Sequence, residues 1–347
     1  MDGCLRSRRF FSDPRHHDPP GQNPNHTWHH RTALNAIAAT ANADGITSVS
    51  LPELIALRVR AGKPLADAAR IRAPLAGGHV SALRGRGMDY AESRVYQPGD
   101  DARNIDWRRT ARSGKWHTKL FEAERERSLL LLIDTHATMR FGTRVRFKSV
   151  AAARAAAWLA WTCVRGGDRV GAMAFGPVRA AIDPHAGTRG ALAALGAIAR
   201  WDGSTHAADG EASGEPLSVA LQRAQRLMAP GSRAWLLSDG WCVDAAAAAA
   251  LARLSRHADV RVAIVADALE RELAPAGAYL FETGSRKQRV DLSTAASRAR
   301  FREQMSQGRL GLAGACEAAG IAWTTLAASD DPEVSLASLW RRRARRT

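Results

Sequence analysis

A continuous apolar run, Leu129 to Ile133, dominates the hydrophobic pattern of the chain and stops abruptly at Asp134. A strand that is apolar at every position is buried on both faces, which is typical of a central strand in a parallel sheet covered by helices. Further apolar strands are predicted at 169–175, 234–239, 260–265 and 321–326. Between the strands, apolar residues recur three and four positions apart, a spacing that predicts helices. These helices cover about 145–165, 188–200, 216–228 and 298–320. The alternation predicts an α/β fold with a doubly wound, mostly parallel sheet and helices on both faces.

Four regions follow from shifts in composition along the chain. Residues 1–30 are rich in Arg, His, Pro and Asn, have little apolar surface, and are predicted to form a disordered basic, histidine-rich tail. Residues 31–128 are predicted to form N-terminal helices and a turn-rich segment with short strands, a small α+β region; one helix opens at the capping box Ser50 to Glu53. The α/β domain occupies 129–327, and 328–347 is a C-terminal segment ending in an arginine-rich tail.

The composition limits the cellular location and the classes of partner that we expect. The 347 residues carry a formal charge of +16, so an acidic protein, an anionic membrane surface or nucleic acid must be considered as a partner. The four cysteines form no C-x-x-C pair, and no apolar segment follows the N-terminal arginines, so neither a disulfide framework nor a secretory signal is predicted. We expect no transmembrane segment and a cytoplasmic location, with a peripheral position at the inner membrane left open.

A charged, turn-rich motif precedes the long apolar strand. It combines Pro-Gly-Asp turn chemistry with a helix-capping aspartate and contains Pro98, Gly99, Asp100, Asp101, Arg103, Asp106, Trp107 and Arg112. Three carboxylates close to two arginines predict a network of forked hydrogen bonds that supports the fold. A catalytic carboxylate pair is the alternative, although no nucleophile or base stands beside the motif.

Polar side chains gather where the predicted strands end. Asp134 and Thr138 follow the first strand, Asp239 ends another, and Thr205 lies in a predicted Gly203-Ser204-Thr205 loop. Open α/β sheets bind ligands beyond the carboxyl ends of their strands. The sequence therefore predicts that oxygen ligands from three loops meet on one rim.

The motif and the strand ends together resemble the domain-of-unknown-function 58 (DUF 58) family. The resemblance rests on the order Arg94-x-Tyr96-x-Pro98-Gly-Asp-Asp-x-Arg103-x-Ile-Asp-Trp107, then Ala111-Arg112, the strand ending at Asp134, Gly167-Asp168 and Ser238-Asp239-Gly240. It implies a von Willebrand factor A (vWA) type domain, a Rossmann-type α/β fold. It also implies an accessory or adaptor role with a MoxR-type AAA+ ATPase as partner.

The vWA resemblance implies a metal-ion-dependent adhesion site that holds Mg²⁺. Asp134, Thr138, Thr205 and Asp239 match its ligand positions, whereas His136 replaces the first serine of the family pattern. Imidazole is a softer donor than the oxygens that Mg²⁺ prefers, so a degenerate rim that binds a partner without metal is preferred here, with the Mg²⁺ site as the alternative.

Enzymatic motifs are scarce. The chain has no G-x-x-x-x-G-K-[ST] phosphate loop, no G-x-S-x-G elbow and no H-E-x-x-H pair. The leading hypothesis is a non-enzymatic interaction module that docks a partner at the rim. Two alternatives remain open: nucleic-acid or anionic-surface binding through the arginines at 341–346, with nucleic acid the less expected ligand, and a metal-dependent hydrolase.

Overall fold

A six-stranded sheet forms the centre of the molecule in the computed structural model, which describes residues 45–61, 88–123, 127–205, 214–272, 274–283 and 286–341. The strand order is β10-β7-β6-β3-β4-β5, and only β5 runs antiparallel to its neighbour. The strands are β3 (Ser128–Asp134), β4 (Arg169–Phe175), β5 (Ala180–Ala186), β6 (Arg233–Ser238), β7 (Asp259–Ala266) and β10 (Ala322–Ala327). The predicted α/β fold with a mostly parallel sheet is confirmed.

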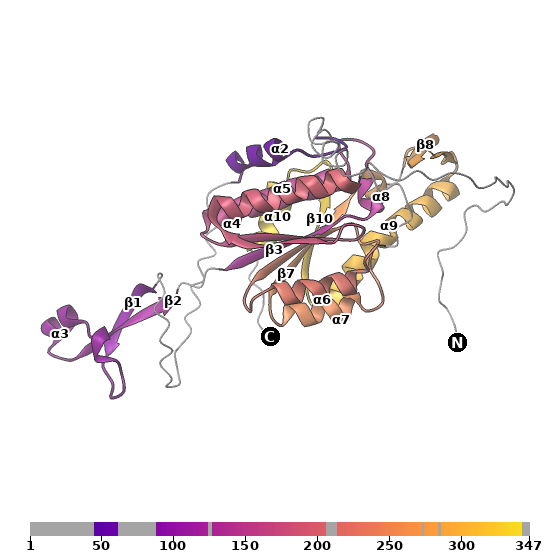
Figure 1. The fold of residues 1–347 in the computed structure, drawn as a ribbon. Helices are drawn as coiled ribbons and strands as arrows, with labels where there is room; N and C mark the ends of the chain where they lie inside the picture. Colours follow the sequence, from indigo (N-terminus) through magenta and orange to yellow (C-terminus); the bar gives the residue numbers. More distant parts are fainter. Residues whose placement is uncertain are drawn as a thin grey trace, which may run out of the picture.

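Helices cover both faces of the sheet (Figure 1). One face packs against α2 (Leu51–Ala56), α4 (Lys148–Arg165), α5 (Gly187–Thr205) and α10 (Pro332–Arg341). The other face packs against α6 (Leu217–Leu227), α7 (Ala247–Ser255) and α9 (Ala295–Ala318). Both layers are built from Leu, Val, Ile and many alanines, which let the helices approach the strands closely. Among the described residues, no helix combines the length and apolar character that crossing a bilayer requires.

Ser50 caps α2 as predicted, but the Glu53 carboxylate of the predicted capping box pairs with Arg154 of α4. The Ser50 hydroxyl accepts the Glu53 N–H, and a 3-10 turn, η1 (Leu57–Val59), extends the helix. Leu54 is fully buried, and its carbonyl accepts a hydrogen bond of 3.0 Å from the indole N–H of Trp161 on α4. The helix is therefore part of the main core. The tail predicted at 1–30, the helix predicted from residue 31 and the arginines at 342–347 lie outside the described residues.

The charged motif folds as a separate hairpin unit, seen apart from the sheet in Figure 1. Strands β1 (Met88–Val95) and β2 (His117–Ala123) pair antiparallel and carry between them η2 (Ala102–Asn104) and α3 (Trp107–Ser113). Within the motif, Asp101 caps η2 and Asp106 caps α3.

The predicted ion-pair network in this unit takes a different form. Arg94 donates to Asp100 at 2.6 Å, and the described contacts of Asp100 include neither Arg103 nor Arg112. Asp106 accepts from the Ser93 hydroxyl at 2.6 Å and from the Arg109 backbone N–H. Asp101 and Asp106 thus serve mainly as backbone caps, because the first turn of a helix leaves unpaired N–H groups and a carboxylate accepts their hydrogen bonds.

The structure adds elements beyond the sequence prediction. Edge strand β5 pairs with β4 beside Gly171, where a Cβ atom would lie 2.7 Å from the Ile182 carbonyl oxygen. A second hairpin, β8 (Ala278–Thr283) and β9 (Arg286–Asp291), follows the short helix α8 (Ala268–Arg271). The described positions of β5 and β8–β9 are exposed or half exposed and polar residues interrupt both, so neither has an apolar run as long as that of β3.

Candidate functional site

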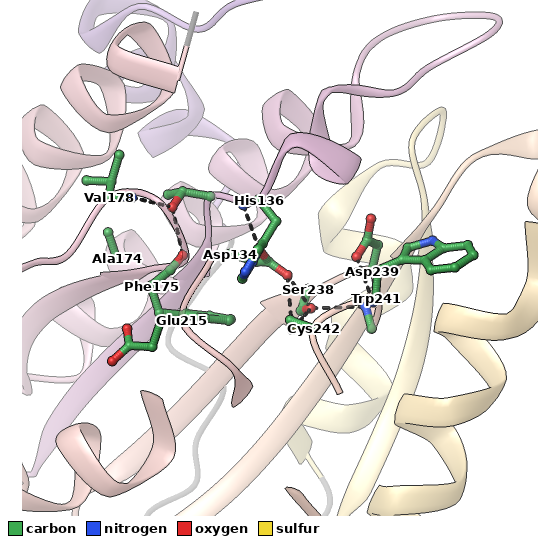
Figure 2. Close-up of polar contacts among 12 residues, drawn as sticks. Asp134, His136, Ala174, Phe175, Val178, Glu215, Ser238, Asp239, Trp241 and Cys242 are labelled. Carbon is green, nitrogen blue, oxygen red and sulfur yellow. Dashed lines mark hydrogen bonds and ion pairs between the residues drawn. The ribbon is translucent and has the colours of Figure 1, made fainter. Parts of the chain in front are cut away.

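The rim is formed by the carboxyl ends of β3, β6 and β7. Asp134 is the last residue of β3 and Asp239 follows β6, so the structure brings these two predicted residues to the same edge (Figure 2). Both are almost fully buried, with 1% and 2% of their surfaces exposed. Buried carboxylates need hydrogen bonds or a neighbouring cation, and the two residues meet this need in different ways.

Asp134 is held by neighbours from its own loop and from the end of β6. Its Oδ1 accepts the His136 backbone N–H at 2.9 Å and lies 2.7 Å from the His136 Nδ1, while its Oδ2 accepts the Ser238 hydroxyl at 2.5 Å. The Cys242 Sγ lies 3.5 Å from the same Oδ2. Burial alone disfavours a charged ring at His136, but the hydrogen bond and the charge of Asp134 outweigh it and raise the pKa of the imidazole above 6.5.

Asp239 is paired with a buried lysine. The Lys148 Nζ donates to Asp239 Oδ2 at 2.8 Å and to Glu270 Oε1 at 2.5 Å, with 1% of the lysine side chain exposed. Burial lowers the pKa of an ammonium, yet the two carboxylates reverse this effect and raise the pKa of Lys148. Phe141 lies over the same ammonium, 5.6 Å from Nζ to the ring centroid. Sequence reasoning missed Lys148; the available signal was the only lysine of α4, at the first position of a mostly apolar, alanine-rich helix.

The two predicted threonine ligands are placed differently from expectation. Thr138 lies on the 3-10 turn η3 (Ala137–Arg140) and is exposed. Thr205 is the last residue of α5 and not part of a loop; its side chain lies outside the described residues. The helix continues this far because Trp201 and Asp202 are buried, with Asp202 Oδ2 accepting the Val49 N–H at 3.0 Å.

These contacts do not fit an adhesion-type Mg²⁺ site. Mg²⁺ requires near-octahedral oxygen ligands. Here the Lys148 ammonium already neutralises Asp239, and His136 occupies the position of a serine. The rim therefore carries its own cation at one of the carboxylates that the metal would use.

An arginine-lined cleft of about 600 Å³ lies beside the rim. Its charged lining consists of Arg271, Arg300, Arg302, Arg309, Glu270 and Glu303. Glu270 also binds Lys148, so the cleft and the rim share a residue.

The turn after β6 fixes helix α9 against the rim. Gly240 has φ +89°, and a Cβ atom there would lie 2.2 Å from the Gly308 carbonyl oxygen of α9. Trp241, 41% exposed, lies over Gly308, where a Cβ atom would be 2.8 Å from the indole. The turn and the helix thus meet through backbone atoms and one aromatic ring.

The fold and the site together define the class of the protein: an α/β protein with carboxylates at the ends of its strands. The family described as "Protein of unknown function DUF58" matches residues 92–310, more than half of the chain. The chain belongs to the DUF58 family, which confirms that part of the sequence resemblance.

Curated relatives occur in mycobacteria. Uncharacterized proteins of Mycobacterium bovis and of two strains of Mycobacterium tuberculosis are 40% identical to this chain over 99 residues. The match covers 28% of this chain and 31% of each relative, so it spans about a third of their length.

Two solved structures are similar at low identity. An aerotolerance-related membrane protein from Bacteroides fragilis has 15% identity and a TM-score of 0.39, over 60% of this chain and 94% of that chain. The conserved hypothetical protein BatB from Bacteroides thetaiotaomicron has 13% identity and a TM-score of 0.33, over 55% and 96%.

Proposed function

We propose that this protein is a non-enzymatic, vWA-type interaction module that binds an acidic segment of a protein partner. The contact surface consists of the exposed Trp241 on the rim and the arginines of the adjoining cleft. The observation that carries the proposal is a cleft lined by four arginines beside α9, the helix whose Gly308 lies against the half-exposed Trp241. Tryptophan and arginine are the residues most enriched at the energetic centres of protein interfaces.

The charges of the cleft favour an anionic occupant. Four arginines face two glutamates, and Glu270 shares the Lys148 ammonium with Asp239. Arg300 and Arg302 are exposed, so each can form forked hydrogen bonds with a partner's carboxylates without losing an existing role.

A non-enzymatic role is supported by the way the rim aspartates are engaged. Asp239 is neutralised by Lys148, and Asp134 is bonded to His136 and Ser238. A general base or nucleophile needs a free path to its substrate, whereas these carboxylates are turned toward partners inside the protein.

The family suggests the partner. As an extension of the resemblance stated above, we propose a MoxR-type AAA+ ATPase, met on the cytoplasmic side, as the protein that supplies the acidic segment. Membership of DUF58 and the basic cleft both support this assignment.

Binding of the full chain to a MoxR-type AAA+ ATPase tests the proposal. We expect the double variant Arg300→Glu with Arg302→Glu to weaken binding by at least about tenfold, roughly 1.4 kcal/mol, because two favourable charges become repulsive. The matched control is Arg253→Glu with Arg256→Glu, two exposed arginines at the end of α7. The dissociation constants of both variants are measured by calorimetry at two salt concentrations.

Two results would contradict the proposal. Equal binding by the cleft variant and the control would remove the cleft from the interface. Binding of the ATPase that does not weaken with added salt would argue against an acidic ligand, because exposed charge pairs are screened.

A further inference from the structure

We propose that Asp134, His136 and Cys242 form a binding site for a soft divalent cation of the Zn²⁺ type. The three residues come from the end of β3, the turn after it and the turn after β6. This site differs from the adhesion-type arrangement in its ligands, its metal and its use of a cysteine. It stands independently of the partner proposed above.

The ligand atoms lie close enough together to share one metal ion. One donor atom from each residue lies within 4.8 Å of the other two. Zinc bonds of roughly 2.0 Å to N or O and 2.3 Å to S place tetrahedral ligands about 3.3 to 3.6 Å apart. The Cys242 Sγ is 3.5 Å from Asp134 Oδ2, and the His136 Nδ1 is 2.7 Å from Asp134 Oδ1. The distance from Sγ to Oδ2 has the length of a tetrahedral edge. The shorter distance is a hydrogen bond to the other carboxylate oxygen, Oδ1, and it opens when a metal replaces its proton.

The donor set selects the metal class. Carboxylate, imidazole and thiolate together suit Zn²⁺ and related ions, whereas Mg²⁺ and Ca²⁺ take oxygen ligands. Asp134 and a deprotonated Cys242 bring two negative charges, which balance a divalent cation. Binding therefore releases the thiol proton of Cys242, and also the ring proton of any protonated His136.

A second layer of contacts orients the ligands. The Ser238 hydroxyl donates to Asp134 Oδ2 at 2.5 Å and lies 3.4 Å from the Cys242 Sγ. The backbone N–H of His136 holds the other carboxylate oxygen. Such outer contacts fix the direction of metal ligands. Three protein ligands leave a fourth position for water or for a donor from another molecule.

Access to the cluster is adequate for a metal. His136 and Cys242 are only partly buried, and Asp134 forms the floor of the cluster. The other rim carboxylate, Asp239, is paired with Lys148 and takes no part.

The experiment uses Co²⁺ as a spectroscopic probe and Zn²⁺ in competition with a chromogenic chelator. Metal-binding residues of the N-terminal tail are first removed from the full chain, giving a background with Cys4→Ser and glutamine at His16, His17, His26, His29 and His30. In this background we expect one equivalent of Co²⁺ to produce the visible bands of a tetrahedral site and a thiolate-to-cobalt charge-transfer band.

Two cysteine variants decide the assignment. We expect Cys242→Ser to abolish the charge-transfer band and to weaken Zn²⁺ binding at least about tenfold. Cys316→Ser, which changes a buried cysteine on α9, should leave both unchanged. His136→Ser should weaken Zn²⁺ binding while keeping the charge-transfer band at saturating Co²⁺. No charge-transfer band in the background protein, or the same band after Cys242→Ser, would overturn the proposal; neither outcome depends on binding of the ATPase.

Discussion

The rim holds two clusters in which a buried carboxylate is stabilised, and the two clusters use different partners to stabilise it. Around Asp239, the Lys148 ammonium supplies a permanent positive charge inside the protein. Around Asp134, the neighbours are an imidazole, a hydroxyl and a thiol, all of which are neutral or titratable. The first cluster is sealed around a permanent cation, whereas the second is more open and its charge can vary with pH or with a bound ion.

The Asp239 cluster therefore has a structural role, whereas the Asp134 cluster can respond to pH or to a bound ion. A buried ion pair with good geometry tolerates little change, because losing one partner leaves the other charged and unsolvated. A cluster that lacks a permanent cation can exchange a proton for a metal with little movement of its ligands. Neighbouring strand ends thus provide a support and a candidate binding site.

The substitution Lys148→Ala is expected to have the largest effect on stability. The substitution leaves Asp239 and Glu270 buried without their cation, and we expect a loss of about 3 to 5 kcal/mol in the free energy of unfolding. Urea denaturation followed by circular dichroism measures it. The matched control changes all three groups together, Lys148→Met with Asp239→Asn and Glu270→Gln. This triple variant should be clearly more stable than Lys148→Ala; if it is equally unstable, the lost charge balance is not the cause.

A smaller effect is expected at the Asp134 cluster from Ser238→Ala. The Ser238 hydroxyl donates to Asp134 Oδ2 and accepts the Gly240 N–H at 3.0 Å, so its removal leaves two buried groups short of a partner. We expect a loss of about 1 to 3 kcal/mol by urea denaturation. Ser255→Ala, at an exposed serine at the end of α7, should change stability by less than about 0.5 kcal/mol. Similar losses in both would show that Ser238 does not support the cluster.

The smallest expected effect is a pH dependence at His136. Its folded-state pKa is raised above 6.5 because the contacts to Asp134 outweigh the cost of burial. The stabilisation is therefore complete below pH 6.5 and is lost as the pH rises through the raised pKa. Unfolding free energies in the presence of a metal chelator, compared with His136→Gln, should show a difference that shrinks as the pH increases. A difference that grows with pH would mean that the neutral ring is the one stabilised.

The central sheet could be predicted because a strand that is buried on both faces is apolar at nearly every position. Strands β3, β6 and β7 are apolar almost throughout, and the structure places them side by side. Strand β5 and the β8–β9 hairpin escaped prediction because a half-exposed strand with polar residues resembles a loop. The aspartate caps of the charged motif were visible in the sequence, while the choice of Arg94 as the partner of Asp100 depends on hairpin register.

The candidate site was predictable only in part. Parallel strands deliver their carboxyl ends to one edge, so the meeting of Asp134 and Asp239 followed from topology. Lys148 and Cys242 come from separate segments, and only the tertiary structure shows that they reach the rim aspartates. Thr205 was assigned to a loop because glycine and serine suggest one, but the buried Trp201 prolongs the helix.

The contact of Gly240 with the Gly308 carbonyl has a consequence for how the surface can diversify. Because α9 is seated there on main-chain atoms, its outward-facing arginines can be replaced without altering the separation between helix and strand ends. Relatives that keep Gly240 and Gly308 can therefore change the charges that α9 presents to a partner while the position of α9 against the strand ends stays the same. A methyl group at either glycine would push α9 away from the turn after β6 and alter the spacing between Trp241 and the arginines of the cleft.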